Sequence, residues 1–222
     1  MRGSARSASD QQRHATAKPA RSLIKRAIDI TGSAVTLFFI APLLLLTALV
    51  IRLHDGGPVF YGHRRLGLAG AEFTCWKFRT MAVNSEQLLA DYIARDESAR
   101  REWEACRKLK KDPRVTPVGR LLRATSLDEL PQLWNVLRGD MSLVGPRPIV
   151  SEEISRYGAD YEHYISLRPG ITGLWQVSGR SDTSYRDRIS LDRDYAMRWS
   201  LTRDLSILML TIPAVFFQRG SY

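Results

Sequence analysis

Two acidic residues stand side by side in residues 126–148, which read SLDELPQLWNVLRGDMSLVGPRP. Asp128 and Glu129 lie between basic segments, and Pro131 follows them. Adjacent carboxylates among arginines suit a metal-assisted reaction on a phosphate. The arginines and a divalent ion hold the anion while one carboxylate attacks or transfers a proton. The pair is therefore a candidate catalytic centre.

The same residues also fit a structural role at the start of a helix. Ser126 and Glu129 have the spacing of a capping box, in which both side chains bond orphan backbone amides. Pro131 is tolerated in a first helical turn but not later, so we expect a helix over residues 128–137, ended by Gly139. By themselves the residues favour capping. The two roles are compatible, because a helix N-terminus also attracts phosphate.

Positive charge is concentrated at the N-terminal end of this chain of 222 residues. The formal net charge is +10, and residues 1–26 contribute +6 of it, from seven cations and one acid. A basic tail beside an apolar segment indicates attraction to anionic membrane lipids. Nucleic-acid binding is the other common meaning of such a charge. No helix-turn-helix, zinc-finger or RNA-binding motif accompanies it, so we expect no nucleic-acid partner. Residues 1–20 are expected to form a disordered tail.

The cysteines and histidines give no sign of a disulfide framework or a zinc site. Cys75 and Cys106 are too few and lack zinc-ligand spacing, and the four histidines form no motif such as H-E-x-x-H. A reducing, cytoplasmic compartment fits this usage. With 222 residues, of which 44% are hydrophobic, the chain can bury one substantial core.

Residues 33–51 form a run without a charge that is long enough for a membrane-spanning helix. Pro42 lies at its middle, where a proline removes a backbone hydrogen bond and bends a helix. Positive charges flank both ends of the run, whereas a crossing helix normally has them on one side. We therefore expect residues 21–54 to form a re-entrant helix hairpin that enters the membrane, breaks at Pro42 and returns, in preference to a straight crossing.

The remaining pattern predicts an α+β fold that is mostly helical. Two short apolar or alternating runs, 58–61 and 72–78, indicate a β-hairpin. Further helices are expected over residues 84–110 (one or two, strongly charged), 120–123, 149–157 and 184–200.

An apolar segment, 205–217, is too short to span a membrane. We expect an amphipathic helix at the membrane interface there, with packing in the core as the alternative. The predicted domains are a basic tail (1–20), a membrane-embedded segment (21–54) and a cytoplasmic catalytic domain (55–222).

Several motifs in a fixed order resemble those of the monotopic bacterial sugar transferases, the polyprenyl-phosphate hexose-1-phosphate transferases. In chain order they are KRAID (25–29), the apolar run with Pro42, PVF (58–60), KFRTM (77–81), DPRVT (112–116), residues 126–148, RPGITG (168–173) and VSGR (177–180). The resemblance extends from residue 22 to the C-terminus. It is strongest to the small phosphoglycosyl transferases that begin exopolysaccharide synthesis.

The resemblance implies an enzyme whose catalytic domain faces the cytoplasm at a bacterial inner membrane. It would transfer hexose-1-phosphate, with galactose expected ahead of glucose, from a UDP-hexose to undecaprenyl phosphate and release UMP. Asp128 would be the nucleophile that forms a covalent phosphosugar intermediate. Glu129, together with Asp128, would bind Mg²⁺, or Mn²⁺ in its place. These roles suit phosphoryl transfer, where catalysis is mainly positioning and charge neutralisation. A homodimer is compatible with this scheme.

The resemblance also implies a set of substrate- or phosphate-binding residues: Arg79, Arg123, Arg147, Arg168, Arg180 and Asp192. Each has a structural alternative. Arg79 could lie on the solvent face of a strand, and Arg123 could simply neutralise the acidic pair. Arg147 and Arg168 could be exposed turn residues, and Arg180 could bond its own loop. Asp192 could be a surface charge, and nearby Asp194 could be the matching residue instead.

Two other functions compete with phosphosugar transfer. One is a glycosyltransferase that moves only the sugar and therefore releases UDP. The other is a non-catalytic, membrane-bound scaffold of a polysaccharide assembly complex.

Overall fold

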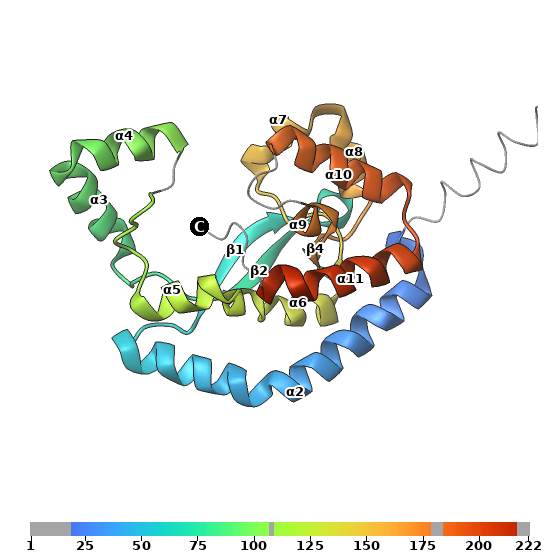
Figure 1. Ribbon diagram of the computed structural model, residues 1–222, viewed down its shortest axis with the longest axis horizontal. Helices are drawn as coiled ribbons and strands as arrows, with labels where there is room; N and C mark the ends of the chain where they lie inside the picture. Colours follow the sequence, from blue (N-terminus) through green and yellow to red (C-terminus); the bar gives the residue numbers. More distant parts are fainter. Residues whose placement is uncertain (1–18, 107–108, 179–183, 217–222) are drawn as a thin grey trace, which may run out of the picture. The chain divides into compact units, whose positions relative to one another are not determined.

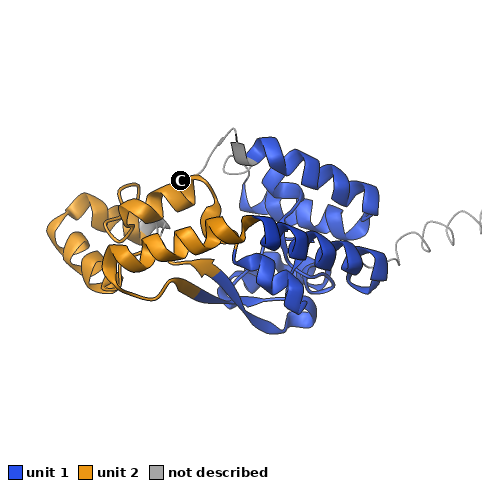
Figure 2. Cartoon of the chain, turned by 90° about the horizontal axis from the view of Figure 1, so that it is seen from below, with its two compact units in different colours: residues 1–39, 62–76, 131–220 blue, residues 40–61, 77–130, 221–222 orange. Residues whose placement is uncertain are grey.

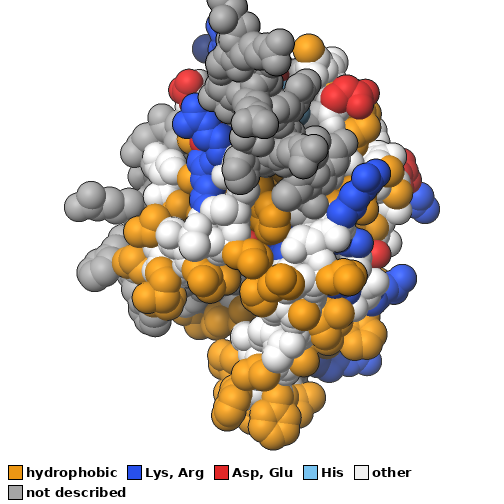
Figure 3. Space-filling view, turned by 90° about the vertical axis from the view of Figure 1, so that its right-hand side faces the viewer, with side chains coloured by type: hydrophobic (Ala, Val, Ile, Leu, Met, Phe, Trp, Pro, Cys, Tyr) orange, Lys and Arg blue, Asp and Glu red, His pale blue; other side chains and the backbone are white. Residues whose placement is uncertain are grey.

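The computed structural model describes residues 19–106, 109–178 and 184–216 (Figure 1). A 3-10 turn, η1 (Pro19–Arg21), precedes α2 (Leu23–Asp55), a helix of 33 residues. In the described part of the chain, α2 is the one helix that is long and apolar enough to cross a membrane. Its large apolar side chains are widely exposed, as in Phe38 (77%) and Phe39 (75%). Figure 3 shows hydrophobic side chains gathered at the lower edge of the face that it draws. Exposure on this scale indicates a surface that is covered by lipid or protein.

α2 is continuous through Pro42. A proline inside a helix removes one hydrogen bond and bends the helix, but it does not have to end it. The break into two helices that the sequence predicted is therefore not observed. The re-entrant path through a membrane stays a prediction.

The described residues group into two units, which Figure 2 colours separately. Unit 1 comprises residues 19–39, 62–76, 131–178 and 184–216, and unit 2 comprises residues 40–61, 77–106 and 109–130. Each unit contains one half of α2. The two units are defined by packing contacts. They therefore do not test the predicted division into a membrane segment (21–54) and a cytoplasmic domain (55–222).

The predicted β-hairpin is present. β1 (Phe60–Leu66) pairs with β2 (Glu72–Phe78), and the turn between them contains η2 (Leu68–Gly70). β1 is longer than expected and includes residues 62–66, which the sequence placed in the turn. An ion pair between Arg64 Nη1 and Glu72 Oε2, at 3.0 Å, connects the polar part of β1 to β2.

Unit 1 contains a second sheet that the sequence did not predict. β3 (Ser142–Val144) and β4 (Gly170–Thr172) pair in parallel, with Ser142 opposite Gly170. Each strand has three residues, which is too short for an alternating pattern to be recognised. Glycine is required at position 170, because a Cβ there would lie 2.1 Å from the backbone nitrogen of Gly145.

The other elements of unit 1 are helical: α6 (Gln132–Arg138), η4 (Ser151–Glu153), α7 (Ile154–Tyr157), η5 (Gly158–Asp160), α8 (Tyr161–Ile165), α9 (Leu174–Val177), α10 (Tyr185–Met197) and α11 (Leu201–Phe216). α10 confirms the helix predicted over 184–200, and Ser184 caps it by accepting a hydrogen bond from the backbone nitrogen of Asp187 at 3.2 Å. The helix predicted over 149–157 begins only at Ser151. α11 begins at Leu201 and not at residue 205, and its place at a membrane interface stays a prediction.

A buried tyrosine connects three segments of unit 1. Tyr164 is 2% exposed, and its hydroxyl donates to the Leu66 carbonyl at 2.7 Å and accepts from the Ile149 nitrogen at 3.1 Å. Leu66, Ile149, Tyr157 and Ile189 pack around it in one cluster. One core therefore joins three parts of unit 1: the β-hairpin, the segment that follows β3, and α10. The buried Tyr164 hydroxyl both donates and accepts a hydrogen bond there.

Unit 2 contains α3 (Ser85–Arg95), α4 (Glu97–Cys106), α5 (Pro117–Ala124) and η3 (Leu127–Glu129). α3 and α4 confirm the charged helices predicted over 84–110. In the core of unit 2, the C-terminal half of α2 packs against β2 and α5 through buried Ile51, Phe78 and Leu122. Thr116 caps α5, because its hydroxyl accepts from the backbone nitrogen of Gly119 at 2.9 Å. α5 therefore begins three residues before the helix predicted over 120–123, with Pro117 in the position where proline is favoured.

Asn135→Ala is expected to destabilise unit 1 by about 2–3 kcal/mol, because it leaves buried backbone groups unpaired. Asn135 is fully buried, accepts from the Trp76 nitrogen at 3.0 Å and donates to the Thr74 carbonyl at 2.7 Å. Thermal unfolding in detergent measures the effect. The matched control is Asn84→Ala, because Asn84 is exposed and makes no capping bond. Equal losses in the two variants would contradict this role for Asn135.

Candidate active site

The acidic pair lies in η3, a 3-10 turn that follows α5. Ser126 has a left-handed backbone (φ 57°) and makes no side-chain capping bond, and the next helix, α6, begins at Gln132. The predicted capping box and the predicted helix start at Asp128 are therefore wrong. The left-handed residue interrupts the helical path after α5, so the two carboxylates stand in a short 3-10 turn before α6. Capping does not occupy them, and they remain available for chemistry.

Asp128 is partly buried and has an unusual acidity for a carboxyl group. Burial, followed by the negative charge of Glu129, raises its pKa from 3.8 to about 6, although Lys77 and Arg123 oppose the shift. The carboxylate is therefore mostly ionised at neutral pH but more basic than an ordinary aspartate. This combination suits a carboxylate nucleophile, which must be charged and yet reactive.

Lys77 is a site residue that the sequence analysis missed. Its Nζ lies 2.5 Å from Glu129 Oε1, and the two side chains are only partly exposed. Lys77 and Arg79 are two residues apart on β2, so alternation along the strand predicts that both project from one face. That signal was present in KFRTM, but it was applied only to Arg79.

Arg79 and Arg123 are both held by partners in unit 2. The guanidinium of Arg79 pairs with Asp55 at the end of α2, and its side chain is 9% exposed, so the solvent-face alternative is wrong. Arg123 donates from Nε to Thr80 Oγ1 at 2.9 Å, and its charge lowers the pKa of Asp128. Arg123 therefore belongs to the electrostatic surroundings of the nucleophile candidate.

Arg147 and Asp192 lie in unit 1. Arg147 is 43% exposed and its Nη1 is 3.8 Å from Glu153 Oε1, so its donors can reach a ligand. Asp192 is 5% exposed and accepts from the Tyr157 hydroxyl at 2.9 Å. Burial raises its pKa to about 7, and Tyr157, Arg147 and Arg188 limit that rise. The surface-charge alternative for Asp192 is therefore wrong. Neighbouring Asp194 is in ion pairs with Arg198 and Arg203.

Arg168 acts as a clamp between backbone segments of unit 1. Its Nε donates to the Gly139 carbonyl and its Nη1 to the Ala20 carbonyl, each at 2.9 Å. This pattern is not that of an exposed turn arginine. Its predicted contact with phosphate is untested.

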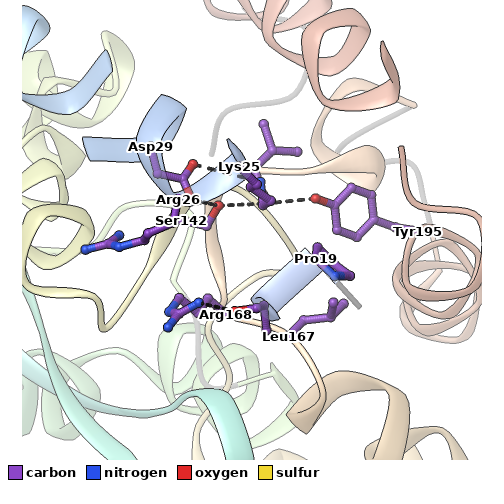
Figure 4. A pocket seen from close by; sticks show the side chains of 10 residues that line it. Pro19, Lys25, Arg26, Asp29, Ser142, Leu167, Arg168 and Tyr195 are labelled. Atoms are coloured by element: carbon purple, nitrogen blue, oxygen red, sulfur yellow. Dashed lines mark hydrogen bonds and ion pairs between the residues drawn. The ribbon is translucent and has the colours of Figure 1, made fainter. Parts of the chain in front are cut away.

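Arg168 also lines a small pocket beside the N-terminal half of α2 (Figure 4). The polar groups there pair with one another. Lys25 Nζ is 2.7 Å from Asp204 Oδ2, and Asp29 Oδ2 accepts from the Ser142 hydroxyl at 2.8 Å. Asp204 also accepts from the Tyr195 hydroxyl at 2.7 Å. The KRAID motif therefore joins α2 to β3, α10 and α11 within unit 1, which is a structural role.

The predicted site residues thus divide between the two units. Arg79, Arg123, Asp128 and Glu129 belong to unit 2, where the acidic pair, Lys77 and Arg123 interact. Arg147, Arg168 and Asp192 belong to unit 1. Arg180 lies outside the described residues.

The acidic pair fits the ligand needs of a magnesium ion. The described residues contain no group of three or more Asp, Glu, His or Cys side chains that could hold a metal. Mg²⁺ does not need such a cage, because one or two carboxylates commonly bind it while substrate phosphates and water complete the octahedron. The charge of Glu129 raises the pKa of Asp128, so the two carboxylates repel one another. A cation between them would remove that repulsion.

The pKa of Asp128 predicts a stability difference that depends on pH. A carboxyl group whose pKa is higher in the folded state makes folding less favourable as pH rises from about 4 to about 6. In metal-free buffer, Asp128→Asn should therefore stabilise the protein at pH 7.5 by up to about 3 kcal/mol. The gain should vanish near pH 4. Thermal unfolding of both proteins across this range measures it, and a gain that is independent of pH would contradict the raised pKa.

Similarity to known proteins agrees with this geometry. The profile of the bacterial sugar transferase family matches residues 20–218. The chain is 49% identical over 205 residues to the exopolysaccharide production protein ExoY of Rhizobium meliloti (strain 1021), covering 92% of this chain and 91% of that protein. It is 50% identical to the undecaprenyl-phosphate galactose phosphotransferase of Salmonella typhimurium, over 93% of this chain and 43% of the larger protein. It is 43% identical to the UDP-glucose:undecaprenyl-phosphate glucose-1-phosphate transferase of Caulobacter vibrioides, over 90% of this chain and 72% of that protein. The chain therefore belongs to the bacterial sugar transferase family.

Proposed function

We propose that this protein transfers hexose-1-phosphate from a UDP-hexose to undecaprenyl phosphate and releases UMP, as the first membrane step of exopolysaccharide synthesis. The observation that carries the proposal is the state of Asp128. It stands in the 3-10 turn η3 and not in an α-helix, next to Glu129, with a pKa of about 6 and with the charges of Lys77 and Arg123 acting on it. The names of the relatives support the same reaction class.

The proposed reaction has two displacements at one phosphorus atom. A carboxylate oxygen of Asp128 attacks the sugar-bearing phosphorus of the donor, the bond to the UMP oxygen breaks, and UMP leaves with that electron pair. A phosphate oxygen of undecaprenyl phosphate then attacks the same phosphorus and breaks its bond to Asp128. The aspartate is regenerated, and the lipid carries a pyrophosphate-linked hexose. A carboxylate nucleophile divides one difficult displacement into two easier ones.

The remaining residues neutralise charge during these steps. Lys77 and Arg123 lower the electrostatic cost of bringing an anionic donor to an anionic aspartate. A Mg²⁺ ion held by Glu129 and Asp128 would supply further neutralisation of the pyrophosphate. Arg147, with its exposed guanidinium, and Arg79 are proposed to contact phosphate oxygens. Within unit 1, Arg168 bonds backbone carbonyls and Asp192 bonds the Tyr157 hydroxyl from largely buried positions, and Arg180 stays a proposed nucleotide contact.

Galactose is the proposed sugar, with glucose as the alternative. Among the relatives named for galactose transfer, those from Salmonella typhimurium and Erwinia amylovora are 50% and 47% identical to the chain, and that from Streptococcus agalactiae is 39% identical. Two relatives named for glucose transfer are 43% and 41% identical. We place the protein in the inner membrane through α2, with its catalytic residues in the cytoplasm, because UDP-sugars are made there and α2 has basic residues at both ends.

A nucleotide-product assay tests the proposal. Protein in detergent is supplied with undecaprenyl phosphate, Mg²⁺ and either UDP-galactose or UDP-glucose, and released nucleotides are separated. UMP formation supports phosphosugar transfer, and the faster donor identifies the sugar. UDP formation would instead support a glycosyltransferase. Absence of turnover with both donors in a folded preparation would favour the non-catalytic scaffold.

A further inference from the structure

Two arginines of unit 1 converge on one carboxylate. Arg65 of β1 lies with its Nη1 3.8 Å from Glu153 Oε2, and Arg147 lies with its Nη1 3.8 Å from Glu153 Oε1. Both distances exceed the range of a hydrogen bond. Glu153 therefore attracts two guanidinium groups without hydrogen-bonding to either through these atoms.

The hydrogen bonds of Glu153 go elsewhere. Its Oε2 accepts from the Val150 nitrogen at 3.0 Å, and its Oε1 accepts from the Tyr185 hydroxyl at 3.1 Å. These bonds fix the carboxylate at the start of η4. The carboxylate lies between the two arginines. Arg65 also contacts the Pro148 carbonyl through Nη1 and His63 Nδ1 through Nη2, each at 3.3 Å, and a guanidinium group has five N–H donors in all, so further N–H groups remain for another acceptor.

Positive charge is in excess around this carboxylate. Arg65 is largely buried (13% exposed), and burial together with the charge of Arg147 lowers the pKa of Arg65. A third guanidinium, that of Arg156, stacks on the Tyr185 ring at 4.9 Å. Arg65 and Arg147 thus place two positive charges beside the Glu153 carboxylate, and Arg147 also interacts with buried Asp192. A bound phosphate would relieve the repulsion between the two guanidinium groups.

The two arginines are held in place by one backbone segment. Arg147 lies between Pro146 and Pro148, which restrict its backbone. The Pro148 carbonyl accepts from Arg65 Nη1 at 3.3 Å. The Arg65 side chain is 13% exposed and the Arg147 side chain is 43% exposed, so Arg147 is the member of the pair that solvent reaches more readily.

We propose that Arg65 and Arg147 form a two-arginine clamp for a phosphate group, which makes Arg65 a substrate-binding residue that the family motifs did not indicate. A phosphate dianion has enough acceptor oxygens for both guanidinium groups, and arginine matches its geometry better than lysine does. The inference rests on the proposed function, in which both the nucleotide donor and the lipid acceptor present a phosphate.

The test compares Arg65→Lys with Arg64→Lys. The two arginines are neighbours on β1, but Arg64 points to solvent (85% exposed) and pairs only with exposed Glu72 among the ion pairs of the described residues. KM and kcat are measured for UDP-galactose and for undecaprenyl phosphate. Binding of inorganic phosphate and of UMP is measured separately by calorimetry, without turnover.

Arg65→Lys should raise KM for one phosphate substrate by about tenfold, with a smaller change in kcat, because one bidentate contact is lost. The substrate whose KM rises identifies whether the clamp serves the donor or the lipid. Arg64→Lys should change neither. Unchanged KM values and unchanged phosphate affinity in folded Arg65→Lys would overturn the proposal.

Glu153→Gln provides a second test with the opposite sign. In glutamine the amide oxygen can still accept from the Val150 nitrogen, and the amide nitrogen can donate to the Tyr185 hydroxyl oxygen, whereas the competing negative charge is removed. Inorganic phosphate should therefore bind about threefold to tenfold more tightly. If Glu153 served only to hold the fold together, affinity would fall or stay the same, and that result would refute the clamp. Phosphate binding needs no turnover, so a protein that makes no UMP but shows this pattern would refute the proposed function and not the clamp.

Discussion

Asp128→Asn is expected to lower the rate of UMP formation by about 10³-fold or more, because an amide cannot replace a carboxylate as nucleophile. The two side chains have the same shape, so the turn of η3 should be retained. The raised pKa of Asp128 even predicts that the variant is more stable than the parent above pH 6. Initial rates of UMP release with saturating donor and acceptor measure the loss.

The control for this substitution is Asp91→Asn, which removes a carboxylate from an exposed position of α3. It should leave the rate within about twofold of the parent, as surface changes usually do. If Asp128→Asn kept a tenth or more of the parent rate, Asp128 could not be the nucleophile.

Glu129→Gln is expected to reduce turnover by about 10²-fold and to raise the Mg²⁺ concentration needed for half-maximal rate, because it would remove a carboxylate that we propose as a metal ligand. It should also move the acidic limb of the pH–rate profile to lower pH. In the proposed mechanism activity needs ionised Asp128, so the rate should fall as pH drops through the pKa of Asp128. The negative charge of Glu129 raises that pKa, so its removal lowers the pKa.

Lys77→Gln tests the same electrostatics in the opposite direction. The positive charge of Lys77 lowers the pKa of Asp128, so the substitution should move the acidic limb to higher pH. Profiles of the parent and both variants are compared at one Mg²⁺ concentration. Shifts of the same sign in Glu129→Gln and Lys77→Gln would contradict the assigned surroundings of Asp128.

Elements with strong local signals could be predicted from the sequence. α10 has Ser184 as its cap, and α2 has a long apolar run. The hairpin follows from alternation in 72–78. In each case a few neighbouring residues determine the element, and tertiary contacts do not overrule them.

Elements that depend on distant contacts could not be predicted. β3 and β4 have three residues each and exist because they pair across the chain, with Gly170 against Gly145. The turn at Asp128 departs from the expected capped helix because Ser126 adopts a left-handed backbone. A capping pattern in the sequence does not reveal that conformation, since the same residues are compatible with a capped helix and with a left-handed turn.

The sequence indicated which residues are candidates for the site, but it did not indicate how their side chains are arranged. The motifs identified Asp128 and Glu129 but did not indicate that Arg168 bonds two backbone carbonyls or that Asp192 bonds Tyr157. The sequence analysis did not name Lys77, which pairs with Glu129, or Arg65, which we propose as a phosphate ligand. Both lie on β-strands, where alternate residues face opposite sides of the sheet. A motif records which residues occur together, whereas burial and partners determine what each one does.

The most direct test of the central claim is the mass of the acid-quenched protein after incubation with UDP-galactose and Mg²⁺ in the absence of undecaprenyl phosphate. We predict that one phosphohexose group is added to the protein, with equimolar UMP released. After digestion with trypsin the group should be found on the peptide Ala124–Arg138, which contains Asp128. The adduct should disappear on addition of undecaprenyl phosphate and be absent from Asp128→Asn. An adduct on another peptide, or UMP release only when the lipid acceptor is present and without any adduct, would contradict the claim that Asp128 is the nucleophile.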